Sequence, residues 1–183
     1  MGDPRFQRKK YKTPRHPWEG LRIKEENELI REFGLRNKKE IWKSEAILNK
    51  WREQAKRIMS MPAEEKEKEQ KILLGTIRKL GILDEQADLD SVLTLTVRDI
   101  LERRLQTVIY KLALARTPRQ ARQFIVHRKI TVNGTKIDSP SAMIKLADKV
   151  RFIPGFSLKF VKKKEDIPKE IEEHPKEEVA ENA

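Results

Sequence analysis

Eight Lys or Arg residues and no Asp or Glu lie between Arg103 and Lys129. The cations occupy positions 103, 104, 111, 116, 119, 122, 128 and 129. Guanidinium and ammonium groups attract phosphates, and no carboxylate of the same stretch competes for them. This stretch therefore predicts a cationic surface that binds a polyanion.

Catalytic and metal chemistry have little support in the sequence. The chain has no Cys, and His16, His127 and His174 are too far apart to suggest a metal site. Motifs of the GxxxxGK, HExxH and G-x-S-x-G types are absent. A single His beside Arg128 is more often a hydrogen-bond donor to phosphate or backbone than a catalytic base. We expect no catalytic residue, no metal ligand and no cofactor.

The net charge of the whole chain also favours a polyanionic partner. The 183 residues have a formal net charge of +12, with 41 Lys and Arg against 29 Asp and Glu. Such an excess favours nucleic acid or an anionic membrane surface as the partner. No window approaches the roughly 20 apolar residues of a membrane-spanning helix, and no signal-peptide pattern opens the chain. We therefore expect a soluble protein that binds nucleic acid and no membrane.

Two helices and a hairpin are expected to position the cations. Thr96 and Asp99 form a capping-box pattern, so a helix is predicted to begin there and to end at 115–116. Thr117 can cap a second helix, whose first turn accommodates Pro118. Beyond it, Asn133-Gly134 between short alternating runs predicts a β-hairpin, because both turn positions need a positive φ. Further short strands are expected at 143–146 and 150–153.

The second helix has two chemically different sides. Its apolar side is formed by Ala121, Phe124 and Ile125. Its polar side is formed by Arg119, Arg122, Gln123 and Lys129. From the 3.6-residue periodicity we expect the apolar side to face inward and the guanidinium groups to face outward. Arginines paired internally with carboxylates would contradict this arrangement.

This region resembles the small RNA-binding module named after ribosomal protein four of the small subunit. The family pattern occurs here as Glu102-Arg103-Arg104-Leu105, Ala115-Arg116-Thr117, Ala121-Arg122-Gln123, His127 and the hairpin from Ile130 to Gly134. The likeness continues through 139–146 and 148–150, and residues 1–18 look like the start of the archaeal and eukaryotic branch. Ala113 and Arg128 depart from the pattern, because the family usually or often has Gly there. These departures concern backbone geometry and remove no basic contact.

The resemblance implies a structural constituent of the small ribosomal subunit and not an enzyme. It implies binding to a multi-helix junction in the 5′ domain of small-subunit rRNA, nucleation of subunit assembly, and a contribution to mRNA entry and translational accuracy. The implied partners are rRNA and neighbouring ribosomal proteins, those on the side where mRNA enters, in the cytoplasm and without a homo-oligomer. One alternative is a non-ribosomal pre-rRNA assembly factor of the same family. An RNA-modifying enzyme that carries the module is a weaker one, because the rest of the chain lacks catalytic motifs.

The remaining sequence predicts an α+β protein in four parts. Residues 1–18 form a basic arm with interleaved aromatics or, alternatively, a disordered basic tail. Residues 19–95 form a helical lobe, 96–164 the RNA-binding module with two helices and short antiparallel strands, and 165–183 an acidic flexible tail, with eight acids against two lysines.

Three helices are expected in the lobe. One spans 21–33 and ends at Gly34, one begins at the capping-box pattern of Asn37 and Glu40 and ends before Pro62, and one spans 64–80 and ends at Gly81. The second has a buried side at 41, 48, 55 and 59 and a cationic stripe opposite, at 39, 43, 50 and 57. That stripe is either an ordinary solvated side or a second contact for phosphates.

The candidate rRNA-binding residues come from the module, the stripe and the arm. They are Arg103, Arg104, Lys111, Arg116, Thr117, Arg119, Gln120, Arg122, Gln123, His127, Arg128, Lys129 and Asn133; Lys39, Lys43, Lys50 and Arg57; and Arg5, Arg8, Lys9, Lys10, Tyr11, Lys12 and Arg15.

Overall fold

The computed structural model describes residues 9–84 and 86–156. Within these ranges it has seven α-helices followed by one three-stranded antiparallel sheet, which confirms the predicted α+β class. Arg5, Arg8 and the predicted acidic tail lie outside the described residues.

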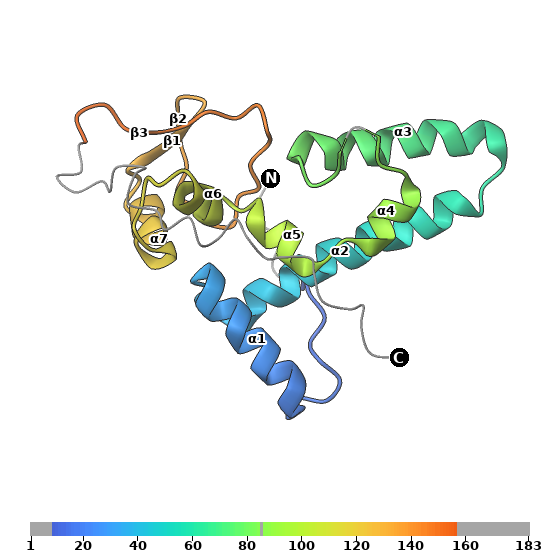
Figure 1. The fold of residues 1–183 in the computed structure, drawn as a ribbon, viewed down its shortest axis with the longest axis horizontal. Coiled ribbons are helices and arrows are strands. Elements are labelled where there is room, and N and C mark those ends of the chain that lie inside the picture. Colours follow the sequence, from blue (N-terminus) through green and yellow to red (C-terminus); the bar gives the residue numbers. More distant parts are fainter. Residues whose placement is uncertain (1–8, 85, 157–183) are drawn as a thin grey trace, which may run out of the picture.

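The long helix α2 (Lys38–Met59) is the axis of the helical part (Figure 1). It packs against α1 (Gly20–Phe33), α3 (Ala63–Leu80), α4 (Leu89–Thr94) and α5 (Val97–Glu102). Its buried side chains recur at helical spacing and are those of Ile41, Ser44, Leu48, Trp51, Ala55 and Ile58. Burial of this apolar stripe stabilises the lobe more than intrinsic helix propensity does. The predicted ends of all three long helices are confirmed, with Gly34 and Gly81 in the left-handed conformation.

The helix predicted from Thr96 to 115–116 is wrong in one respect. The capping box of Thr96 and Asp99 is present, but α5 ends at Glu102 and a new helix, α6 (Leu105–Lys111), begins after Arg104. Between them the backbone N–H of Leu105 donates to the Ala142 carbonyl at 2.8 Å, and that of Ile144 donates to the Arg103 carbonyl at 3.0 Å. Hydrogen bonds from a distant segment therefore replace those of a continuous helix.

The rest of the module is a helix packed on a small sheet. Helix α7 (Pro118–Val126) begins as predicted, with the Thr117 hydroxyl accepting from the Gln120 backbone N–H. The sheet order is β2-β1-β3, formed by β1 (Ile130–Val132), β2 (Thr135–Lys136) and β3 (Val150–Phe152). The Asn-Gly hairpin is confirmed, with φ of 51° and 83° at its two turn residues. The strand expected at 143–146 is wrong, since only an isolated bridge between Arg104 and Met143 forms there.

Two helix ends in the module have strained backbones. Ala113, after α6, has a φ of 55°, and Arg128, after α7, has a φ of 56°. These are the two positions at which the sequence departs from the Gly of the family pattern. A side chain in this conformation costs roughly 1–2 kcal/mol relative to glycine.

The module docks on the end of α3 through backbone contacts. The Leu146 backbone N–H donates to the Lys79 carbonyl at 3.1 Å, and the Arg103 guanidinium donates to the Gly81 carbonyl. A Cβ atom on Gly81 would lie 2.4 Å from Cγ of Leu146. Gly81 therefore ends α3 and also leaves the space that Leu146 occupies.

Candidate nucleic-acid interface

The cationic stripe of α2 is exposed as the periodicity predicted. Lys39, Lys43, Lys50 and Arg57 all have exposed side chains, while the opposite side of the helix is buried. Their spacing of four or seven residues brings them near one side of a regular helix. The geometry suits a line of phosphates, and the role of these residues in binding RNA stays a prediction.

Two arginines of the module do not face outward. Arg104 lies with its side chain only 5% exposed and donates to Oε2 of Glu40 at 2.7 Å. Arg122 donates to Oε1 of the same carboxylate at 2.8 Å, and its side chain is 23% exposed. We call Glu40, Arg104 and Arg122 the Glu40 cluster. It contradicts the expectation that the guanidinium of Arg122 faces outward, and it ties α2 to the module.

Gln106 contacts the Glu40 cluster through Arg122 and was not among the candidate residues. It is buried, and its side-chain amide donates to the carbonyls of Phe33, Gly34 and Pro118 at 2.9–3.1 Å. Its Oε1 accepts from Arg122 at 3.2 Å. A polar residue inside an apolar helix pattern was the one signal in the sequence that could have marked it, since buried amides are retained where they are hydrogen-bonded.

The Glu40 carboxylate is held in its charged form. Burial by itself raises the pKa of Glu40, but the hydrogen bond from Arg122 and the charges of Arg104 and Arg122 outweigh it and lower the pKa. The same carboxylate explains why the predicted capping box at Asn37 is wrong: the helix starts after Asn37, but no side-chain cap forms there and Glu40 is bound to the two arginines.

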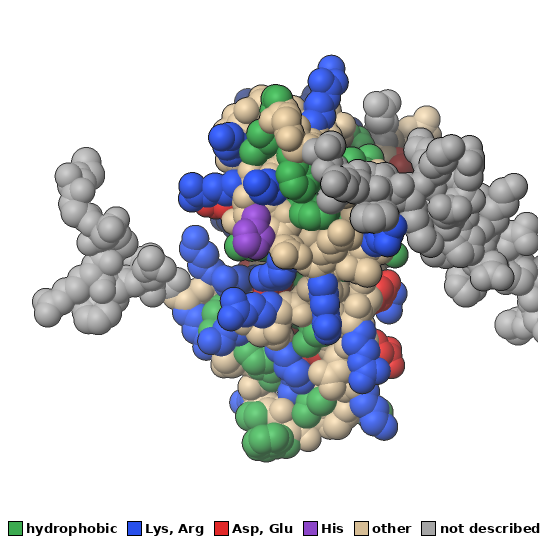
Figure 2. Space-filling model, turned by 90° about the vertical axis from the view of Figure 1, so that its left-hand side faces the viewer, with side chains coloured by type: hydrophobic (Ala, Val, Ile, Leu, Met, Phe, Trp, Pro, Cys, Tyr) green, Lys and Arg blue, Asp and Glu red, His purple; other side chains and the backbone are tan. Residues whose placement is uncertain are grey.

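The other cations of the module lie nearer the surface. Arg116, Arg119, Arg128 and Lys129 are exposed, as are Gln123 and His127. Two of the exposed cations form surface ion pairs: Lys111 with Glu102 at 2.7 Å and Arg128 with Asp138 at 3.0 Å. Exposed pairs of this kind contribute little stability and open at low cost, so a phosphate can replace the carboxylate. Figure 2 shows many Lys and Arg side chains scattered over one face of the molecule, with fewer Asp and Glu, mainly near its edges.

Three polar candidates are engaged in local structure. The Thr117 hydroxyl caps α7, and Oε1 of Gln120 accepts from the Arg116 backbone N–H at 2.7 Å. The Asn133 amide donates to Asp148 at 2.8 Å and accepts from the Lys149 backbone N–H at 2.9 Å. That network lowers the pKa of Asp148, first through the Lys145 backbone N–H and then through Asn133. These side chains hold turns in place, whatever else they contact.

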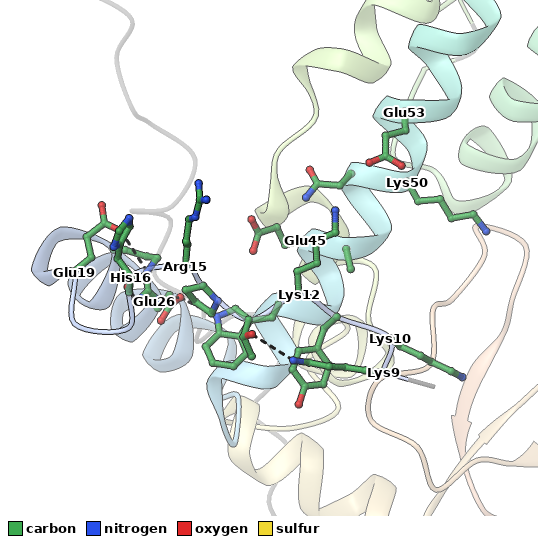
Figure 3. A pocket seen from close by; sticks show the side chains of 17 residues that line it. Lys9, Lys10, Lys12, Arg15, His16, Glu19, Glu26, Glu45, Lys50 and Glu53 are labelled. Carbon is green, nitrogen blue, oxygen red and sulfur yellow. Dashed lines mark hydrogen bonds and ion pairs between the residues drawn. The ribbon is translucent and has the colours of Figure 1, made fainter. Parts of the chain in front are cut away.

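The described part of the arm lies against α1 and α2 around an open groove of about 570 Å³ (Figure 3). Tyr11 packs on Trp42 with ring centroids 6.0 Å apart, and the Lys9 ammonium lies 5.0 Å from the centre of the Tyr11 ring. Lys10, Lys12 and Arg15 are exposed along the same segment. Cations and aromatic rings therefore occur together here, a combination that suits RNA.

Below the arm, Glu26 forms a second buried carboxylate site. It accepts from Arg22 at 2.5 Å and from Nε1 of Trp42 at 3.0 Å, and it pairs with Lys38 at 3.0 Å. Burial opposes its ionisation, but the hydrogen bonds from Trp42, Lys38 and Arg22 together lower its pKa. Nothing in the sequence distinguished Glu26 from the exposed acids of α1.

Two further properties concern the residues that the structure describes. None of their helices combines the length and apolarity needed to cross a bilayer. Among the same residues, no three His, Asp or Glu side chains gather in a way that could hold a metal ion.

Comparison with known proteins places the whole arrangement in one family. Residues 103–150 match the S4 domain, and residues 5–102 match the ribosomal protein S4/S9 N-terminal domain. The small ribosomal subunit protein uS4 of Methanothermobacter thermautotrophicus is 48% identical over 161 residues, 87% of this chain and 94% of the relative. That of Ignicoccus hospitalis is 50% identical over 79% of this chain and 87% of the relative.

The Methanosphaera stadtmanae protein of the same name is 43% identical over 97% of this chain and 100% of the relative. The two matched domains meet at residues 102 and 103, next to the break between α5 and α6, and together they cover residues 5–150. Because both domains and nearly the full length agree, the chain belongs to the uS4 family of small-subunit ribosomal proteins.

Proposed function

We propose that the protein is a structural, non-catalytic constituent of the small ribosomal subunit that binds small-subunit rRNA. The observation that carries the proposal is the presence of exposed cations in two regions of the fold. The stripe of α2 lies on the helical lobe, and the exposed residues after Thr117 lie on the module. Membership of the uS4 family supports it independently.

The mechanism we propose is recognition of RNA shape through phosphates. Lys39, Lys43, Lys50 and Arg57 contact one stretch of backbone, and Arg119 with Lys129 contacts another. Duplex RNA hides the base edges of its major groove, so a rigid pair of cationic surfaces recognises the phosphate geometry of a junction better than a sequence. The 5′-domain junction of the rRNA is the partner we propose, and binding there is an early step of assembly.

Salt dependence tests this mechanism directly. If about six to ten phosphates are neutralised, rRNA affinity falls by roughly 10³–10⁵ between 50 and 200 mM salt. Filter binding with a 5′-domain transcript measures this fall. A binding constant that changes less than about tenfold over that range would contradict the phosphate mechanism.

Location in the cell separates the proposal from its main alternative. We propose that the protein stays in mature cytoplasmic subunits, beside ribosomal proteins at the side where mRNA enters, and contributes to accuracy there. A pre-rRNA assembly factor of the same family would sediment with precursors and leave before maturation. Sucrose-gradient fractionation with immunodetection decides between them, because only the structural constituent co-sediments with mature small subunits.

The division into an arm (1–18), a helical lobe (19–95), a module (96–164) and a tail (165–183) stays a prediction. The helical lobe and the module contact each other through the Glu40 cluster and through Leu146, which packs against Gly81. Limited proteolysis tests the division, since cleavage in linkers precedes cleavage in packed elements.

A further inference from the structure

A cavity of about 340 Å³ lies where α2 meets the module. From α2 it is lined by Glu40, Lys43 and Ser44, and from the module by Arg104, Arg122 and Ser141. Its size is at the lower end of the range for small-ligand sites, which suits a single small polar group.

The charge of this cavity is positive. Three cations, Lys43, Arg104 and Arg122, face one carboxylate, Glu40, so the four groups sum to +2. Both oxygens of Glu40 are already bound by the two arginines, which leaves the ammonium of Lys43 uncompensated within this set. A partly buried cluster of this sign attracts an anion more strongly than an exposed one, because solvent screens it less.

Arg104 also has hydrogen-bonding capacity that the described residues do not use. Nε of Arg104 is buried and has no hydrogen-bond partner among the described residues. Buried N–H donors almost always have an acceptor, because losing the hydrogen bond to water without a replacement is destabilising. Ser44 and Ser141 add hydroxyl groups to the same lining.

We infer that this cavity binds one phosphate group, held by Lys43 and by the nitrogens of Arg104 and Arg122 that Glu40 does not occupy. Charge-assisted hydrogen bonds from guanidinium and ammonium groups are the usual phosphate ligands in proteins. The inference rests on the proposed function, in which the group is a phosphodiester of rRNA. A bound phosphate would contact both α2 and the module and so hold the two parts in one relative orientation.

The decisive comparison is between Lys43→Ala and Lys39→Ala. Both side chains are exposed on α2, both changes remove one charge, and only Lys43 lines the cavity. We expect Lys43→Ala to weaken binding of a 5′-domain transcript about tenfold more than Lys39→Ala does, because it removes a charge-assisted contact in a partly desolvated site. Phosphorothioate interference should show one backbone position that loses its effect in Lys43→Ala alone.

A second experiment uses inorganic phosphate. In ¹⁵N-resolved NMR of the free protein, the Arg104 Nε–H resonance should shift saturably with phosphate in the wild type and in Lys39→Ala, and not in Lys43→Ala. A shift without any difference between the variants in RNA binding assigns the site to free phosphate. No shift, together with equal RNA affinities, overturns the inference. If the wild-type protein itself fails to bind rRNA, the proposed function falls. Equal RNA affinities of the two variants with intact wild-type binding refute only the binding of an rRNA phosphate in the cavity.

Discussion

The two cationic regions of the molecule differ in how well the sequence predicts whether their side chains are exposed. On α2 the four cations at 39, 43, 50 and 57 are all exposed, although Glu40, Glu45 and Glu53 stand among them. In residues 103–129 of the module, where eight cations occur without any acid, Arg104 and Arg122 are bound to a carboxylate. That carboxylate lies 64 and 82 residues away along the chain. The absence of neighbouring acids therefore says little about whether a cation is available to RNA.

The difference has a physical cause. A long helix buries one side against its neighbours, so its opposite side faces solvent over its whole length. The helices α6 and α7 of the module are short, with 7 and 9 residues, and a long arginine side chain can reach a carboxylate on another element. Buried arginine is stable only when paired, so Glu40 is required by Arg104.

Removing the apolar side of α7 should have the largest effect. Phe124 is 9% exposed and contacts the rings of Phe152 and Phe156 at centroid distances of 5.8 and 5.9 Å. We expect Phe124→Ala to lower the free energy of unfolding by about 3–5 kcal/mol. Urea denaturation measures it, with the exposed Val126→Ala on the same helix as control; equal losses in both would contradict the packing described.

Removing the carboxylate of the Glu40 cluster should come next. We expect Glu40→Gln to lower the free energy of unfolding by about 3 kcal/mol, because it leaves Arg104 and Arg122 without a counter-charge. Glu53→Gln, at an exposed position of the same helix, should change it by less than about 0.5 kcal/mol. If the two variants unfold at the same denaturant concentration, the cluster is not a stabilising contact.

Substitutions of the two arginines of α7 should affect different properties, one mainly the stability of the protein and the other mainly rRNA binding. Arg122→Ala should lower the free energy of unfolding by about 1–3 kcal/mol, since it removes hydrogen bonds to Glu40 and Gln106. Arg119→Ala should leave stability within about 0.5 kcal/mol and weaken rRNA binding severalfold, because its side chain is exposed. Thermal unfolding and filter binding on the same preparations test both, and an Arg119 variant as destabilised as the Arg122 variant would refute the distinction.

A smaller effect, an increase in stability, is expected from a substitution at the end of α6. Ala113 has a φ of 55°, so Ala113→Gly should raise the free energy of unfolding by about 1 kcal/mol. Ala142→Gly, which has no such backbone conformation to relieve, provides the control and should not stabilise the protein. Denaturant titration at equal protein concentration compares them.

Lowering the pH should narrow the difference in free energy of unfolding between the wild type and Glu40→Gln. The pKa of Glu40 is lowered from its ordinary 4.5, so its ion pairs contribute fully above that pH and are lost as the pH falls through the folded-state pKa. The same holds for Glu26, which both proteins retain. Urea midpoints measured from pH 7 to pH 3 should therefore converge, and a constant gap would show that the charge of Glu40 is not what stabilises the cluster.

Local patterns in the sequence were sufficient to predict most of the helix ends and the hairpin. Gly34, Gly81, Thr117-Pro118 and Asn133-Gly134 each act through their own backbone or immediate neighbours, so their positions could be inferred from residue type alone. The same holds for the buried side of α2 and for the inward side of α7.

The contacts between distant residues could not be inferred in this way. The helix break at Arg104 depends on hydrogen bonds from 142–144, and the burial of Glu26 depends on Trp42 and Lys38. Periodicity and capping are interactions over three or four residues, which a linear sequence displays directly. Which carboxylate meets which arginine depends on distances in the folded chain, and these exist only after α2 and the module have packed together.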